Sequence, residues 1–285
     1  MMLRAKDGTR IRARRWEGGA DTVLLLQGRT EYIEKYERIA ADLVARGFSI
    51  VTLDWRGQGG SERALTDPMI GHVRRFEEYQ ADLRAVLPLL TGRVFVIAHS
   101  MGGLIALRWL MEGGAADAAA FSAPMFGLPM GGLMRPVASL VAGGSGLLNR
   151  AASPVPGIGL APYVLEAGFA GNTLTSDPEV FDRLQAEARA MPDRMLGAPS
   201  LGWLGAALAE MRALSLRPSP AIPALAMVGS HERVVDPGAI RARMARWTGA
   251  VLTTIEGGEH ELMMERPPIR RTFLDAAEIL FRRRP

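Results

Sequence analysis

The sequence of 285 residues contains no cysteine. Disulfide scaffolds, thiolate zinc sites and cysteine nucleophiles are therefore excluded. Aromatic residues make up only 6% of the chain, but 48% of its residues are hydrophobic, which is typical of a globular domain. No apolar run reaches the roughly 18–20 residues that a membrane-spanning helix requires, and no apolar segment follows the first charges as it would in a secretory signal. We therefore expect a cytoplasmic protein.

The chain also lacks a strong net charge, because its 34 basic and 30 acidic residues give a net charge of +4. The basic residues are almost all arginine and are scattered along the chain without a nucleic-acid recognition motif. We therefore expect no nucleic-acid partner. Contact with an anionic membrane surface is a better alternative, and solvated surface arginine is the simplest interpretation. The sequence does not indicate the oligomeric state.

Strand-like and helix-like segments alternate along most of the chain, which is typical of a mostly parallel sheet covered by helices. Short apolar runs predict buried strands at residues 22–26, 48–53, 94–98, 118–121, 222–228 and 251–255. Helical spacing of apolar residues predicts helices within 33–44, 76–90, 101–111, 238–247 and 268–283. An antiparallel hairpin is expected around residues 10–16, at the start of the chain.

This alternation stops between residues 124 and 220, where glycine and proline are dense. Short helices are expected there at residues 178–191 and 201–214. We interpret 124–220 as an inserted helical cap over the sheet. Residues 1–123 and 221–285 then form a single α/β core.

Ser100 lies where a predicted buried strand meets a predicted helix, within Ala98-His99-Ser100-Met101-Gly102. This is the context of the nucleophile elbow, a tight strand-to-helix turn that exposes a serine hydroxyl. The residues two before and two after the serine approach each other closely, so both must be small. Gly102 meets this need fully, and Ala98 adds only one methyl group to the usual glycine. Ser100 is the candidate nucleophile.

A serine hydroxyl needs a base to take its proton. His260 follows the last predicted strand in a glycine-rich loop, at the edge of the sheet where open α/β sheets place their sites. His99 adjoins the nucleophile with its side chain directed away, and His72 precedes a helix, so both are expected to be structural. His260 is therefore the candidate base, in preference to His231.

The base in turn needs an acid, which in this chain order should follow the strand at residues 222–228. Glu232 and Asp236 both qualify by position. Acyl transfer also needs N–H donors for the oxyanion. The backbone N–H of Met101 is one candidate donor, and the backbone N–H of Arg29 is the other, because Gly28 lets this loop approach the site.

Five segments carry a resemblance to a known family: residues 27–36, 54–61, 71–79, 172–177 and 229–233. They resemble the monoglyceride lipase and lysophospholipase branch of the α/β-hydrolases, also called serine-aminopeptidase-like hydrolases. The resemblance covers nearly the whole chain and is weakest in the cap. It implies an α/β-hydrolase fold with no metal and no organic cofactor.

The resemblance also favours Glu232 as the acid, because the family has aspartate at this place in its Gly-Ser-x-Asp-Arg segment. Two further departures are Gln27, where the family has histidine, and Ala98, where it has glycine. Each of the three changes is chemically conservative.

The cap is rich in flexible apolar side chains, which suit a disordered acyl chain. These are Met125, Phe126, Leu128, Met130, Leu133, Met134, Phe169, Met191, Met195, Leu201, Trp203 and Met211. Equally, they could form the core of the cap itself. We expect Gly28, Met125, Phe126 and Trp203 to contact the substrate.

The predicted substrate is a single-chain lipid ester, either a lysophospholipid or a monoacylglycerol. Two alternatives stay open. One is an esterase or aminopeptidase of the same fold acting on short or non-lipid substrates, and the other is a non-catalytic ligand-binding protein.

Overall fold

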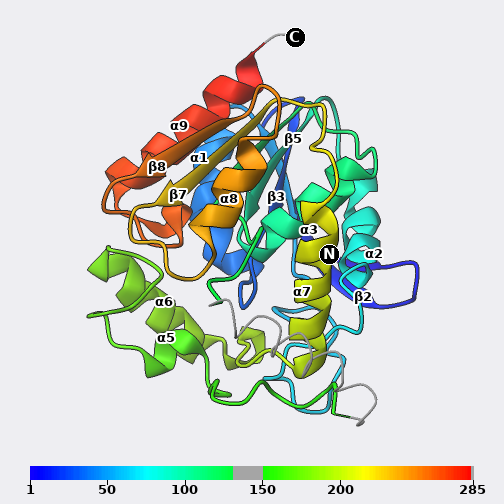
Figure 1. Ribbon diagram of the computed structural model, residues 1–285, viewed down its shortest axis with the longest axis vertical. Helices are drawn as coiled ribbons and strands as arrows, with labels where there is room; N and C mark the ends of the chain where they lie inside the picture. Colours follow the sequence, from blue (N-terminus) through cyan, green and yellow to red (C-terminus); the bar gives the residue numbers. More distant parts are fainter. Residues whose placement is uncertain (131–149, 284–285) are drawn as a thin grey trace.

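The computed structural model describes residues 1–130 and 150–283, and its centre is an eight-stranded sheet (Figure 1). The strand order is β1-β2-β4-β3-β5-β6-β7-β8. The first two strands join antiparallel, and every pairing from β4 to β8 is parallel. The strands are β1 Met2–Arg4, β2 Arg10–Trp16, β3 Thr22–Leu26, β4 Ser49–Leu53, β5 Val94–His99, β6 Ala118–Ser122, β7 Ala224–Gly229 and β8 Val251–Ile255.

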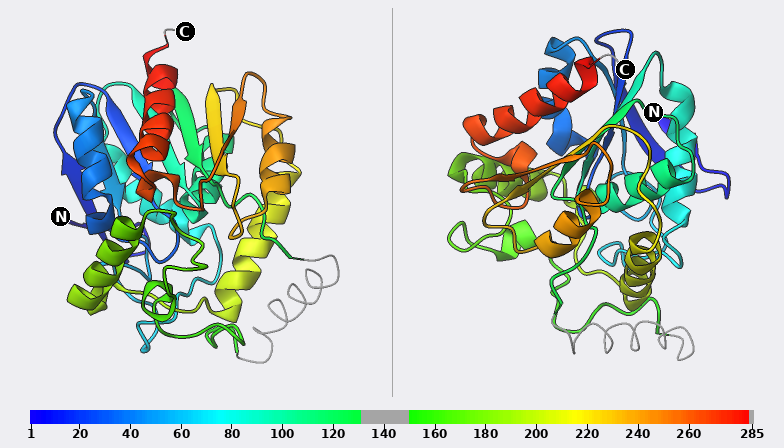
Figure 2. Two further views of the ribbon diagram at one scale, coloured as in Figure 1. Left: turned by 90° about the vertical axis from the view of Figure 1, so that its left-hand side faces the viewer. Right: turned by 45° about the horizontal axis from the view of Figure 1, so that its top comes forward.

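Helices cover both faces of this sheet (Figures 1 and 2). On one face, α1 Glu37–Ala45 and α9 Pro267–Arg282 pack through residues such as Ile39 and Phe273. On the other face lie α2 Glu78–Val86, α3 Met101–Met111 and α8 Pro237–Met244. Because both faces are covered, the central strands are mostly apolar, and every residue of β3, β4 and β6 is buried.

The amphipathic helices form where apolar residues recur at helical spacing. Helix α1 continues from the 3-10 turn η1 Ile33–Tyr36 and is followed by Gly47, whose φ of 87° lies in the left-handed region that glycine adopts readily. The other 3-10 turns are η2 Leu87–Leu89, η3 Pro192–Arg194 and η4 Leu262–Met264. Each predicted strand and helix of the core is present, with bounds that differ by a few residues at most.

Between β6 and β7 the chain forms α5 Tyr163–Glu166, α6 Pro178–Ala190 and α7 Leu201–Ser215, which lie at the carboxyl end of the sheet (Figure 1). Asp177 caps α6 by accepting the N–H groups of the first turn. Helix α7 packs against α3 and buries Trp203 within the main core cluster. The described part of the predicted cap therefore shares its core with the sheet domain. The division at residues 124 and 220 stays a prediction, and Leu133 and Met134 lie outside the described residues.

Within the described residues, none of the helices combines the length and the apolar character needed to span a bilayer.

Candidate active site

Ser100 lies at the sharp turn between β5 and α3, with φ 49° and ψ −117°. Residues other than glycine rarely have a positive φ, so the backbone at Ser100 is strained. This strained conformation persists because the surrounding structure fixes it. The N–H of Ser100 donates to the Ser122 carbonyl at 3.1 Å, and its own carbonyl accepts from Gly103 and Met125 at 2.9 Å each. These contacts hold the serine at the carboxyl end of the sheet.

The small residues around Ser100 are needed for backbone contact, as the sequence predicts. A Cβ at Gly102 would lie 2.3 Å from the Leu26 carbonyl oxygen and 2.5 Å from that of Gln27. Ala98 is fully buried in β5. The turn therefore accepts one methyl group before the serine but none after it.

His260 and Glu232 are hydrogen-bonded to each other, with His260 Nδ1 2.8 Å from Glu232 Oε2. Both side chains are buried. The other carboxylate oxygen of Glu232 accepts the N–H groups of Val234 and Val235 at 2.6 and 2.9 Å. Burial acts to raise the pKa of Glu232, but the hydrogen bond and charge attraction of His260, together with these N–H groups, hold it below its ordinary value. An ionised carboxylate only accepts, so His260 Nδ1 is the donor of this hydrogen bond, which leaves Nε2 on the other side of the ring.

Asp236, the alternative acid, is placed elsewhere. Its Oδ1 accepts the N–H of Gly238 at 2.8 Å and caps the first turn of α8. Of the two candidate acids, the structure brings only Glu232 to His260. His231 is more than half exposed and lies near Glu259, while His72 Nδ1 lies 2.8 Å from Ser200 Oγ.

The His260 ring lies beside the nucleophile turn, because its centroid is 4.7 Å from that of His99, the residue before Ser100. His99 Nδ1 is 3.0 Å from the Ser122 carbonyl oxygen. Burial lowers the pKa of His99 to about 4, so this ring is neutral near pH 7. His99 is thus a buried neighbour of the candidate base, a contact that sequence reasoning missed.

The loop after β3 approaches Ser100 through Gly28, where a Cβ would lie 3.1 Å from that of Ser100. Its backbone is fixed by Glu31, whose carboxylate accepts the Gly28 N–H, and by Gln58, whose amide donates to the Gly28 carbonyl at 2.9 Å. Thr30 in this loop has a φ of 65°, which is strained for a β-branched residue. Gln27 directs its amide to the Leu53 carbonyl in the sheet.

A buried charge cluster lies behind the site and was not predicted. Lys35 Nζ donates to Glu31 and to Glu261, at 2.7 Å each. Glu31, Glu261 and His99 place possible ligand atoms within 4.8 Å of one another. A metal ion there would have to displace the Lys35 ammonium, which already bonds both carboxylates. The only sequence signal was the i, i+4 spacing of Glu31 and Lys35.

The residues expected to contact the substrate fall into two groups. Gly28 and Met125 adjoin Ser100 directly. Phe126 and Trp203 are buried in the main core, where Phe126 packs edge-on against Phe121.

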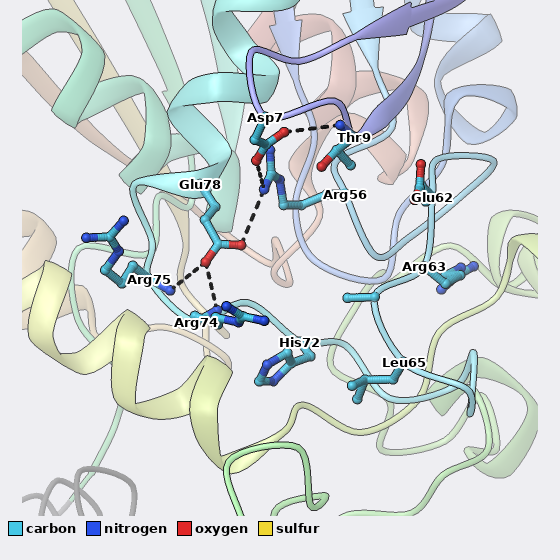
Figure 3. Close-up of a pocket in the computed structure, with 11 residues that line it drawn as sticks. Asp7, Thr9, Arg56, Glu62, Arg63, Leu65, His72, Arg74, Arg75 and Glu78 are labelled. Atoms are coloured by element: carbon cyan, nitrogen blue, oxygen red, sulfur yellow. Dashed lines mark hydrogen bonds and ion pairs between the residues drawn. The ribbon is translucent and has the colours of Figure 1, made fainter. Parts of the chain in front are cut away.

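Figure 3 shows a separate surface pocket of about 680 Å³ that contains none of the predicted catalytic residues. Arg56 lies in its wall and bonds Asp7 at 2.7 Å and Glu78 at 3.3 Å. Two further bonds join Arg56 to the buried Asp82, at 2.8 and 2.7 Å. The arginine of the segment at 54–61 therefore ties the amino-terminal hairpin to α2.

A family model described as serine aminopeptidase, S33, matches residues 20–267. The chain belongs to the serine aminopeptidase S33 family. This confirms the predicted family and the prediction that the chain is a hydrolase.

Relatives support this membership over most of the chain. Lysophospholipase L2 of Escherichia coli strain K12 is 33% identical over 283 residues, covering 92% of this chain and 80% of that protein. Probable lysophospholipase L2 of Haemophilus influenzae is 27% identical, covering 88% of this chain and 80% of its own length.

Solved structures confirm the α/β-hydrolase fold. Monoacylglycerol lipase of Paleococcus ferrophilus has a TM-score of 0.74 at 17% identity, covering 95% of this chain and 98% of that one. A soluble variant of monoglyceride lipase from Saccharomyces cerevisiae has a TM-score of 0.76 at 17% identity, covering 98% and 95%. At this identity the likeness concerns the fold alone.

Proposed function

We propose that this chain is a serine ester hydrolase that cleaves single-chain lipids with Ser100 as nucleophile, His260 as base and Glu232 as acid. The observation that carries the proposal is the buried His260–Glu232 hydrogen bond of 2.8 Å, beside the strained turn at Ser100. A strained serine next to a carboxylate-oriented imidazole is the arrangement that activates a hydroxyl for acyl transfer.

The reaction has two steps. Nε2 of His260 takes the Ser100 proton while Oγ bonds to the ester carbonyl carbon, and the carbonyl oxygen becomes an oxyanion that the backbone N–H groups of Met101 and Arg29 stabilise. The oxyanion then re-forms the C=O bond as the bond between the acyl carbon and the alcohol oxygen breaks, and His260 gives its proton to the departing alcohol oxygen. A water molecule repeats the sequence on the acyl-enzyme and releases the carboxylic acid.

The surroundings of the Met101 and Arg29 backbone N–H groups are consistent with their role as oxyanion donors. Among residues 1–130 and 150–283, neither N–H donates to a protein acceptor. Met101 opens α3, whose N-terminal end favours developing negative charge.

The lipid substrate is supported by the relatives. Lysophospholipase L2 of Escherichia coli and probable lysophospholipase L2 of Haemophilus influenzae each match most of the chain. Met125, which follows β6, donates its N–H to the Ser100 carbonyl and adds an apolar side chain beside the nucleophile turn, as an acyl chain would require. Contact with an anionic membrane surface and a cytoplasmic location remain part of this proposal.

The proposal is tested by labelling and by a substrate panel. A fluorophosphonate probe should label the wild-type protein at Ser100 and leave folded Ser100→Ala unlabelled. Absence of an adduct in folded wild-type protein would indicate a ligand-binding protein instead. Rates on p-nitrophenyl esters from acetate to laurate, with lysophospholipid and monoacylglycerol beside them, separate the lipid enzyme from the short-chain esterase or aminopeptidase. A sharp optimum at acetate with no lipid hydrolysis would remove the lipid substrate.

A further inference from the structure

The guanidinium of Arg29 lies between core and cap with few partners. Its Nη2 donates to the Gly197 carbonyl at 2.7 Å, and its Cζ lies 5.2 Å from the centroid of the Trp203 ring. Its Nε is buried and has no acceptor among the described residues. A guanidinium has five N–H donors, and this single hydrogen bond is all that the described part of the chain offers the side chain.

Two other arginines that are largely withdrawn from solvent, the partly exposed Arg63 and the buried Arg243, provide a comparison. Like Arg29, Arg63 and Arg243 have no carboxylate partner among the described residues, and burial lowers the pKa of each. Arg63 compensates by donating to five backbone carbonyls. Arg243 donates to two carbonyls and to the Ser219 hydroxyl. Their donors are used inside the protein, whereas those of Arg29 are largely unused.

The electrostatic consequence is a desolvated cation for which residues 1–130 and 150–283 supply no counter-ion. Burial lowers the pKa of Arg29 to about 10, and the only opposing influence is the nearby Tyr79. Even so, the guanidinium keeps its charge near pH 7. A buried cation costs free energy unless an anion pairs with it. An anion that binds beside Arg29 would pair with this positive charge and accept hydrogen bonds from guanidinium N–H groups that have no acceptor among the described residues.

Arg29 also lies next to the proposed nucleophile, where it could reach the head group of a bound substrate. Its backbone N–H is the second oxyanion donor of the proposed function, and the preceding Gly28 approaches Ser100. Its side chain extends from there toward Gly71, where a Cβ would lie 3.0 Å from Nη2. In a lysophospholipid, one glycerol unit separates the cleaved ester from the phosphodiester. An arginine side chain spans a comparable distance from its own N–H.

We infer that the Arg29 guanidinium binds the phosphodiester of a lysophospholipid whose ester is cleaved at Ser100, and that this residue sets a preference for phospholipid over neutral lipid. The inference rests on the proposed function and names the substrate class of the same site. The planar guanidinium can donate two parallel hydrogen bonds to two phosphate oxygens, whereas a lysine ammonium cannot form this bidentate pair.

The test compares two substrates that share one acyl chain. Lauroyl lysophosphatidylglycerol carries the phosphodiester, and monolauroylglycerol does not, both as monomers below their micellar concentrations. In Arg29→Gln, the ratio of kcat/KM for the phospholipid to that for the neutral lipid should fall about ten- to hundred-fold, mainly through KM. Arg29→Lys should restore part of the ratio. The matched control is Arg84→Gln on the surface of α2, where the side chain is 60% exposed and the ratio should not change.

An unchanged ratio in Arg29→Gln, or an equal loss on both substrates, overturns the inference, because a residue that only joins cap to core affects both alike. A thermal melt confirms that each variant is folded. If Arg29→Gln does not fold, an inhibition experiment on the wild-type protein tests the inference instead. Glycerophosphoglycerol, the head group alone, should inhibit monolauroylglycerol hydrolysis competitively, and absence of inhibition overturns the inference.

Failure of the inference is distinct from failure of the proposed function. Wild-type protein that is labelled at Ser100 and cleaves only the neutral lipid loses the phosphodiester site but keeps the hydrolase. Wild-type protein that is folded but unlabelled loses both.

Discussion

Nζ of Lys35 lies 2.7 Å from Oε1 of Glu261, although 226 positions separate them in the sequence. Glu261 directly follows the candidate base His260, and Lys35 also bonds Glu31, which fixes the Gly28 N–H. One buried ammonium thus joins the loop of the candidate base to the loop of the proposed oxyanion donor.

Lys35→Met should destabilise the protein most strongly at high pH. In the wild type, burial acts to raise the pKa of Glu31, but the charge and hydrogen bond of Lys35, together with His99 and the Tyr36 hydroxyl, lower the pKa from 4.5 to about 2. Its contribution to stability is therefore present above pH 4.5 and is lost as the pH falls toward 2. Without Lys35, the two buried carboxylates lose this cation. The pKa of Glu261, which burial already holds above its ordinary value, rises further, and that of Glu31 rises above its unfolded value.

The resulting penalty should be about 3–5 kcal/mol near pH 8 and smaller at pH 5, where protonation relieves it. Urea unfolding at both pH values measures the difference, with Lys35→Arg as the charge-preserving control. Equal penalties at pH 5 and pH 8 would contradict the role of Lys35 as counter-ion.

Glu232→Gln should lower kcat about 10²- to 10⁴-fold, because the amide cannot stabilise the imidazolium that forms on His260. Asp236→Asn is the matched control. An asparagine caps α8 as an aspartate does, so stability and kcat should stay close to wild type. Steady-state rates on one p-nitrophenyl ester compare the two variants. A larger loss of kcat in Asp236→Asn would reverse the assignment of the acid.

Gly28→Ala should reduce kcat about ten- to hundred-fold, because small displacements at a reacting centre are costly, and it should also lower the melting temperature, because the buried Glu31 carboxylate must shift. The added Cβ would lie 3.1 Å from the Ser100 Cβ and 2.8 Å from Glu31 Oε2. Gly168→Ala is the control, since a Cβ there meets nothing within 4 Å. Rates and thermal melts of both variants check this. Equal kcat in the two would mean that the loop does not shape the site.

Local patterns were sufficient for the secondary structure of the core. The apolar run at 22–26 and the helical pattern at 101–111 match β3 and α3 residue for residue. A buried strand is apolar on both faces, and a covering helix is apolar on one face. Both patterns can therefore be recognised from residues that are neighbours in the sequence. Helix α7 was predicted as part of the cap, but its packing into the main core depends on α3, to which no local pattern points.

By itself, the sequence determined the strands and helices, the turn at Ser100 and the family, because each depends on residues that are close along the chain. Only the tertiary structure decided that Glu232 rather than Asp236 meets His260, that Lys35 joins two loops, and that the described residues offer the Arg29 guanidinium a single hydrogen bond. The physical reason is that these side chains belong to loops at one edge of a parallel sheet, and the strand order that gathers them there is not a property of any single segment.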